Sequence, residues 1–142
     1  MRQFISIIEN QLPNTHLFPA GTIFYHGTDD DDFKLYRGIW VTDHIDVAKE
    51  FARRNAYGDG DLRIISLSLN HPLELPVFYT SYDFDEYLED NDISSYGAED
   101  MRDDAVARNI PGWYIPNNYG SGQADIFITD ISNLSIVDSV NF

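Results

Sequence analysis

The chain contains no cysteine among its 142 residues, which excludes disulfide bridges and thiolate metal sites. Basic residues are scarce: 9 lysines and arginines stand against 24 aspartates and glutamates, giving a net charge of -15 and a pI near 4.2. Nucleic-acid backbones and anionic membranes bind proteins largely through lysine and arginine. The composition therefore argues against unaided binding to either surface.

Long apolar runs are also missing. The N-terminal stretch MRQFISIIENQL reaches Glu9 after only a few consecutive apolar residues, so it is too short and too polar for a signal peptide or a membrane span. The whole chain is nevertheless 43% hydrophobic and 14% aromatic, which is typical of a folded protein and not of a disordered acidic tail. We therefore expect one folded domain over residues 1–142, in a soluble, cytoplasmic protein.

The hydrophobic periodicity changes several times along the chain and predicts an α+β fold with no internal repeat and no linker. Helical patterns cover residues 2–12, 44–55, 81–104 and 101–110. Their expected inward residues include Ile45, Val47, Ala48, Phe51 and Ala52, and later Phe84, Tyr87 and Leu88. Short β-prone segments are expected at 22–26, 38–41, 63–69, 70–78, 112–115, 124–129 and 134–140.

The segment FYHGT ends a β-prone run with an imidazole, a glycine and a hydroxyl at one point. A single histidine is most often an ordinary surface or core side chain, but here Gly27 follows His26 directly. Glycine allows a ligand to approach the backbone closely and adopts φ values closed to other residues. His26, Gly27 and Thr28 together therefore predict contact with a polar ligand such as a ribose or a carboxamide.

Two later segments give this tripeptide a context. In GIWVTDHIDVAKEFA, a glycine opens a strand that carries Trp40, and a helix with Phe51 on one face follows. In QADIFITDISNLSIV, Asp125 begins an alternating strand and Asp130 lies in the turn after it. The three segments, in this order, resemble the ADP-ribosyltransferase fold in its diphtheria-toxin-like and poly(ADP-ribose) polymerase-like branch.

Members of that branch have His-Gly-Ser/Thr at a strand end, then Gly-Ile-Tyr-Phe-(Ala/Ser/Thr) before a helix, and a final strand similar to Asn-Glu-Tyr-Ile-Val-Tyr-Asp. The matching pieces YHGT, GIWVTD and ADIFITDISNL belong to segments that cover about a quarter of the chain. The resemblance implies an α+β domain whose two small antiparallel or mixed sheets form a cleft for NAD, flanked by short helices.

The resemblance also implies roles for the polar residues. His26 would bond ribose hydroxyls of NAD, Gly27 would hold the nicotinamide carboxamide through its backbone, and Thr28 would contact the adenosine side. Asp125 stands where the family has its catalytic glutamate, with a side chain one methylene shorter. Gln123 is similar to the acceptor-orienting residue of the Gln-x-Glu arrangement in other transferases of this fold, or is an ordinary loop glutamine.

Aromatic residues would form the walls of the nicotinamide site. Trp40 stands where the family has a tyrosine and would stack on the nicotinamide ring. Phe51, or alternatively Tyr57, would supply the second wall, and Tyr36 is a further candidate. Trp113 and Tyr114 resemble the family's preceding strand and are expected in the core.

The function implied by the resemblance is NAD-dependent mono-ADP-ribosylation of a host or partner protein, with release of nicotinamide and without a metal. The small size and the acidity suggest an effector, viral or encoded by a mobile element, that acts against host defence. The main competing hypothesis is a non-catalytic acidic module that mimics nucleic acid or inhibits a basic partner. A third hypothesis is an NAD glycohydrolase. A fourth is a transferase acting on 2'-phosphorylated RNA, which would need more basic residues than this chain has.

Acidic clusters allow two interpretations. Four consecutive aspartates follow Thr28, and residues 81–104 hold ten acids with Arg102 as the one base. Carboxylates facing the pyrophosphate of NAD would weaken binding, so we expect most of them to face solvent; contact with a basic acceptor is the second interpretation. His16, His44 and His71 have no companion motif and are expected to be surface or capping residues.

Overall fold

The computed structural model describes residues 14–30, 33–35, 38–54, 60–93, 98–116 and 124–142. The helix predicted over residues 2–12 lies outside the described residues. The described elements are β1 Thr15–Phe18, β2 Ile23–Thr28, β3 Ile39–Val41, α2 Ile45–Arg54, β4 Arg63–Leu69, β5 Leu73–Pro76, α3 Ser81–Asp90, α4 Ala98–Ala107, β6 Gly112–Ile115, β7 Asp125–Ile128, the 3-10 turn η1 Ile131–Asn133, and β8 Leu134–Asn141.

These elements confirm the predicted α+β class, with strands at every predicted β-prone segment. The strand β1 was not predicted, because the sequence THLF is short and lies between two prolines. It becomes a strand through long-range pairing with β5, which joins Thr15 to Pro76 and Phe18 to Leu73. This pairing adds a two-stranded sheet to the two sheets that the resemblance implies.

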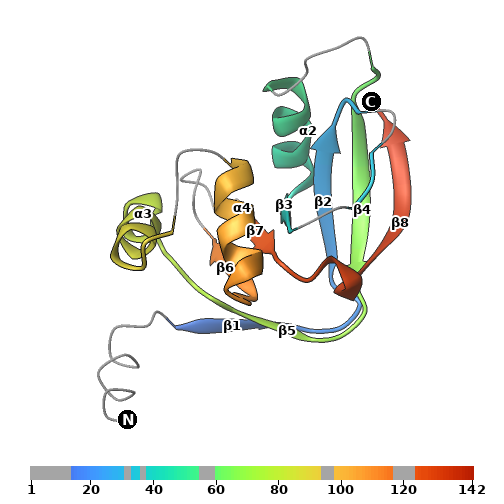
Figure 1. Cartoon of the computed structure of the whole chain (residues 1–142). Coiled ribbons are helices and arrows are strands. Elements are labelled where there is room, and N and C mark those ends of the chain that lie inside the picture. Colours follow the sequence, from blue (N-terminus) through green and yellow to red (C-terminus); the bar gives the residue numbers. More distant parts are fainter. Residues whose placement is uncertain (1–13, 31–32, 36–37, 55–59, 94–97, 117–123) are drawn as a thin grey trace.

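The two larger sheets have three strands each, in the orders β2-β4-β8 and β3-β7-β6 (Figure 1). All pairings within the sheets are antiparallel. The sheets meet where β2 approaches the end of β3: the Tyr25 N–H donates to the Thr42 carbonyl at 2.8 Å, and the Thr42 N–H donates to the Tyr25 carbonyl at 2.9 Å. Beyond this point the strands separate, so side chains of β2 and β3 can border a common space.

Helix α2 packs directly on β2 at Gly27. A Cβ atom on Gly27 would lie 1.9 Å from the carbonyl oxygen of Ala48 and 3.0 Å from the Cβ of Ala52. Val47, Ala48 and Ala52 are buried, as predicted, whereas Ile45 is 43% exposed at the first position of the helix, so its assignment to the inner face was wrong. Glycine at position 27 therefore allows α2 to approach β2 closely. The sequence had suggested a different reason for this glycine, namely close approach of a ligand.

Two hydrophobic cores flank the sheet β3-β7-β6. One fills the space between the two larger sheets, with Phe24, Leu67 and Ile126 fully buried. The other lies beneath α3 and α4 and consists of Phe78, Phe84, Leu88, Ile93, Met101, Ala105, Trp113, Ile115 and Phe127. Phe84 and Leu88 point inward as predicted, and Trp113 belongs to the core as expected. The acidic residues of α3 lie on its exposed side.

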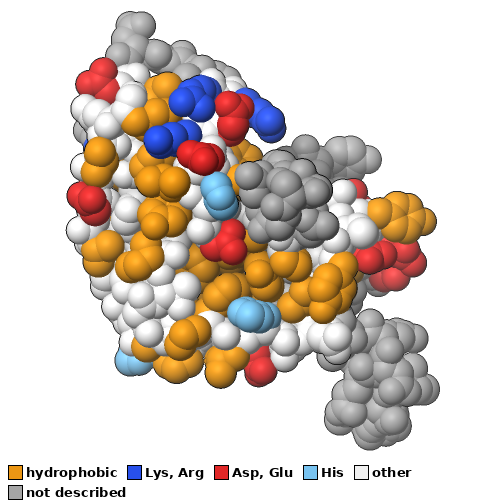
Figure 2. Space-filling model, turned by 180° about the vertical axis from the view of Figure 1, so that it is seen from behind, with side chains coloured by type: hydrophobic (Ala, Val, Ile, Leu, Met, Phe, Trp, Pro, Cys, Tyr) orange, Lys and Arg blue, Asp and Glu red, His pale blue; other side chains and the backbone are white. Residues whose placement is uncertain are grey.

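Strand β8 forms one edge of its sheet and is largely exposed. Ile136, Val137 and Val140 are 49%, 56% and 51% exposed. Figure 2 shows hydrophobic side chains along the margin of the face on the side where β8 lies. None of the described helices is both long enough and apolar enough to span a membrane.

Candidate functional site

A pocket of about 310 Å³ opens where the two larger sheets separate. Strands of both sheets and helix α2 contribute to its walls. The lining residues are Tyr25, His26 and Gly27 from β2, Trp40 and Val41 from β3, Phe51 from α2 and Asp125 from β7. The three segments singled out in the sequence therefore meet at one place.

His26 is fixed in the pocket by a hydrogen bond between the two sheets. Its Nδ1 lies 2.8 Å from the carbonyl oxygen of Trp40. A carbonyl can only accept, so Nδ1 carries the hydrogen, and in the neutral ring Nε2 keeps a free lone pair. The ring of Phe33 lies beside the imidazole, with the centroids 5.1 Å apart. His26 is therefore held so that its Nε2 can accept a hydrogen bond.

The imidazole of His26 is held in its neutral form. Burial lowers the pKa of His26 below its ordinary value of 6.5, and the positive charge of Arg102 lowers it further, while the hydrogen bond to the Trp40 carbonyl opposes this shift. Burial is the largest of these influences because the surrounding protein solvates an imidazolium poorly. At neutral pH His26 therefore carries no charge, and its Nε2 can accept a hydrogen bond.

This shift predicts a pH dependence of stability. As the pH falls through 6.5, the unfolded chain takes up a proton at His26 while the folded chain does not, so the folded state loses stability. The loss from one such group is at most about 1.4 kcal/mol per pH unit. Urea unfolding at pH 7.5 and pH 5.5 should show a smaller loss for His26→Gln than for the wild type, with His71→Gln as control. Equal losses in the wild type and His26→Gln would contradict the assignment of a neutral His26.

Trp40 and Asp125 lie on the same face of the sheet β3-β7-β6. Trp40 is registered opposite Phe127 of β7, and Asp125 stands two residues before Phe127 on the same strand, so the three side chains project to one side. The rings of Trp40 and Trp113 are near parallel, at 28°, with centroids 6.4 Å apart. Trp40 therefore packs against the core that contains Trp113 and also lines the pocket.

Phe51 reaches the pocket from the opposite wall. It is half-buried on α2, three residues after Ala48, which contacts β2 at Gly27. Because α2 is locked onto β2 at this point, Phe51 takes a defined position relative to His26. The pocket therefore has one aromatic side chain from β3 and another from α2.

The structure brings together five of the residues predicted from the sequence and leaves out Thr28. His26, Gly27, Trp40, Phe51 and Asp125 all line the pocket. Thr28 is not among the lining residues, and its hydroxyl instead accepts a hydrogen bond from the Asp30 N–H at 3.1 Å. Tyr36, Tyr57 and Gln123 lie outside the described residues.

Tyr25 and Val41 also line the pocket but were not singled out in the sequence. Tyr25 directly precedes His26, so its side chain points to the opposite face of β2. The isolated pairing of Tyr25 with Thr42 brings this part of β2 to the pocket. Local sequence patterns do not predict such a pairing. Among the described residues, no group of three or more His, Asp and Glu side chains is placed to hold a metal ion.

No protein-family model matches the sequence, and no curated protein matches it. A chain in the crystal structure of the M. tuberculosis MbcT–MbcA toxin–antitoxin complex has a similar fold, with a TM-score of 0.56 over 97% of this chain and 91% of that chain. The two sequences are 13% identical, so the likeness concerns the fold and does not extend to activity. This chain therefore shares its fold with a component of a toxin–antitoxin complex.

Proposed function

We propose that this protein binds NAD in the pocket between its two larger sheets and transfers ADP-ribose from it, with release of nicotinamide. The observation that carries the proposal is the composition of the pocket. One neutral imidazole, two aromatic side chains and one carboxylate, from His26, Trp40, Phe51 and Asp125, border the same space. They come from the three segments whose sequences resemble the ADP-ribosyltransferase fold, which is the fold we propose for the chain.

Each group suits one part of the reaction. Trp40 and Phe51 offer flat apolar surfaces on which a nicotinamide ring can stack. The free lone pair of His26 Nε2 can accept a hydrogen bond from a ribose hydroxyl. The backbone of Gly27 would hold the carboxamide, as the resemblance implies.

The chemical step breaks the bond between the ribose C1 and the nicotinamide nitrogen. The bonding electron pair leaves with nicotinamide, which becomes neutral, and the ribose passes through an oxocarbenium-like state. A fixed carboxylate stabilises this positive charge more than it stabilises the ground state, and we assign this role to Asp125. An acceptor nucleophile then bonds to C1 and loses its proton.

A protein is the acceptor that we favour. One solved structure of similar fold is a toxin–antitoxin complex, in which protein partners are part of the assembly. A net charge of -15 suits a basic protein partner and disfavours RNA as acceptor. The exposed acids of α3 are the observation that favours the second candidate, an acidic module that binds a basic partner without catalysis. An effector role and a viral origin stay predictions.

Phe51 provides a test of the aromatic wall. Phe51→Ala is expected to raise the KM for NAD about tenfold, because one stacking contact is worth on the order of 1–3 kcal/mol. Phe51→Tyr keeps a flat ring and should behave like the wild type. Initial rates of nicotinamide release over a range of NAD concentrations give the KM of each variant. Equal KM values for Phe51→Ala and Phe51→Tyr would remove Phe51 from the site.

Incubation with biotin-labelled NAD distinguishes the candidate functions. A transferase should label specific proteins in a lysate and release nicotinamide faster when the lysate is present. A glycohydrolase should release nicotinamide at the same rate without the lysate and label nothing. If neither label nor nicotinamide appears, while the lysate yields a partner whose binding weakens with salt, the acidic binding module is the better account.

A further inference from the structure

The described residues that line the pocket offer no positive charge to an anionic ligand at pH 7. Their ionisable side chains include the carboxylate of Asp125 and the imidazole of His26, which is neutral at pH 7. NAD carries two phosphate groups, and a dinucleotide bound with its nicotinamide in the pocket must place them close by. In a chain with a net charge of -15, a nearby cation is needed to offset repulsion of these phosphates.

Arg102 lies on the helix that covers this part of the molecule. Its neighbour Met101 and Ala105 are buried in the core that contains Trp113 and Phe127, and Trp40 packs against the same core. Helix α4 therefore covers the face of β3-β7-β6 that also bears Asp125 (Figure 1). Arg102 is half-buried, at the flank of the inward-facing residues.

The positive charge of Arg102 lies within electrostatic reach of the pocket. It is close enough to His26 to act on the pKa of the imidazole, although His26 belongs to the other sheet. Charges in water are screened within about 8–10 Å, so such an effect requires proximity. Two observations therefore place Arg102 near the pocket. Helix α4 packs on the core that Trp40 contacts, and the charge of Arg102 contributes to the lowered pKa of His26.

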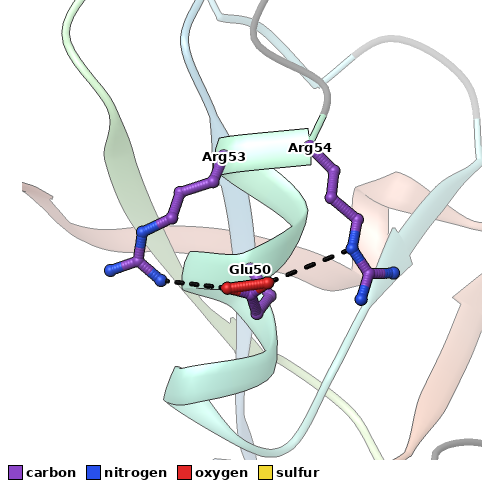
Figure 3. A network of polar contacts seen from close by, with 3 residues as sticks. All are labelled: Glu50, Arg53 and Arg54. Atoms are coloured by element: carbon purple, nitrogen blue, oxygen red, sulfur yellow. Dashed lines mark hydrogen bonds and ion pairs between the residues drawn. The ribbon is translucent and has the colours of Figure 1, made fainter.

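Among the residues that the structure describes, Arg102 forms no ion pair with a carboxylate. Although residues 81–104 hold ten acids, none of those that the structure describes forms an ion pair with Arg102. Other arginines are engaged: Arg53 and Arg54 both pair with Glu50, at 3.3 Å and 4.0 Å (Figure 3), and Arg108 donates to the carbonyls of Asn91 and Asp92. Figure 2 shows most of the Lys and Arg side chains of its face gathered at one end.

We propose that Arg102 is the anion-binding residue of the pocket and receives a phosphate group of the ligand. A guanidinium suits this task because its planar set of N–H donors can bond two phosphate oxygens at once. The identification of that group as the pyrophosphate of NAD rests on the proposed function. The anion site itself does not, since inorganic pyrophosphate presents the same chemistry.

Binding measurements on four proteins test this proposal: the wild type, Arg102→Gln, Arg102→Lys and the control Arg53→Gln. Arg53→Gln removes the same charge from a residue that does not line the pocket and whose guanidinium lies over the ring of Phe142. The ligands are ADP-ribose, inorganic pyrophosphate and nicotinamide riboside, which has no phosphate. Tryptophan fluorescence and the imidazole NMR signals of His26 report binding in the pocket.

Arg102→Gln is expected to weaken ADP-ribose binding about 10- to 100-fold, as for the loss of a charge-assisted hydrogen bond. Nicotinamide riboside should bind all four proteins equally, Arg102→Lys should recover part of the affinity, and Arg53→Gln should match the wild type. Equal ADP-ribose affinity in the wild type and Arg102→Gln overturns the proposal while leaving NAD binding intact.

The outcomes for the proposed function are separate. If the wild type binds pyrophosphate in a manner that depends on Arg102 but binds neither ADP-ribose nor nicotinamide riboside, the anion site stands and the proposed function fails. If the wild type binds none of the three ligands, both proposals are overturned.

Discussion

Asp125→Asn is expected to lower kcat for nicotinamide release from NAD by about 10²–10³-fold, the usual cost of removing one electrostatic group from a transition state. Asparagine has nearly the same shape as aspartate but carries no negative charge. It can still bond a ribose hydroxyl, so KM should change much less than kcat. The ratio of the two effects identifies Asp125 as a group that acts on the developing positive charge.

Two further variants make this test specific. Asp125→Glu introduces the glutamate found in the family that the sequence resembles, and activity in this variant would show that the strand tolerates either side-chain length. Asp85→Asn removes a charge from the exposed side of α3 and should leave the rate unchanged. If Asp125→Asn keeps the rate of the wild type within tenfold, a different group supports the reaction.

Gly27→Ala is expected to reduce the free energy of unfolding by about 3 kcal/mol or more, the upper range for overpacking. The added methyl carbon would lie 1.9 Å from the carbonyl oxygen of Ala48, which belongs to the helix backbone and cannot rotate away. Helix α2 would have to move off β2 as a unit. Because Phe51 belongs to α2, the same displacement would distort the pocket.

Gly21→Ala is the matched control for this substitution. Gly21 has a φ of +87° and no atom within 4 Å of an added Cβ, so alanine there meets conformational strain without a clash. Its cost should stay near 1–2 kcal/mol. Chemical denaturation of both variants and the wild type measures the difference. A Gly27→Ala protein as stable as Gly21→Ala would contradict the close contact between α2 and β2.

Local patterns were sufficient to predict most of the fold. The alternation in RIISLSL and the apolar spacing from Val47 to Ala52 are decided by neighbours in sequence, and β4 and α2 lie where these patterns indicated. Strand β1 depends on pairing with β5, which follows it by more than fifty residues, and the bridge from Tyr25 to Thr42 depends on the meeting of two sheets. Such contacts leave no periodic signal, because only the folded chain brings these residues together.

The residues of the pocket could be predicted only where local motifs mark them. His26, Trp40, Phe51 and Asp125 stood out because short motifs occur in a particular order, and the fold places them around one space. Arg102 was not predicted as a site residue, because its proposed role depends on the packing of α4 against the core that Trp40 contacts. Thr28 was assigned to the ligand from its position in the tripeptide, but the turn after β2 uses its hydroxyl.

The most direct test of NAD cleavage in the pocket is the rate of nicotinamide release by the purified wild-type protein. Proton NMR follows NAD and nicotinamide in the same sample. We expect nicotinamide to appear as NAD disappears, in equal amounts, and a protein acceptor to accelerate the reaction. If NAD stays intact for hours with folded protein at an equal concentration, with and without lysate, the proposed cleavage is refuted and the pocket serves another ligand.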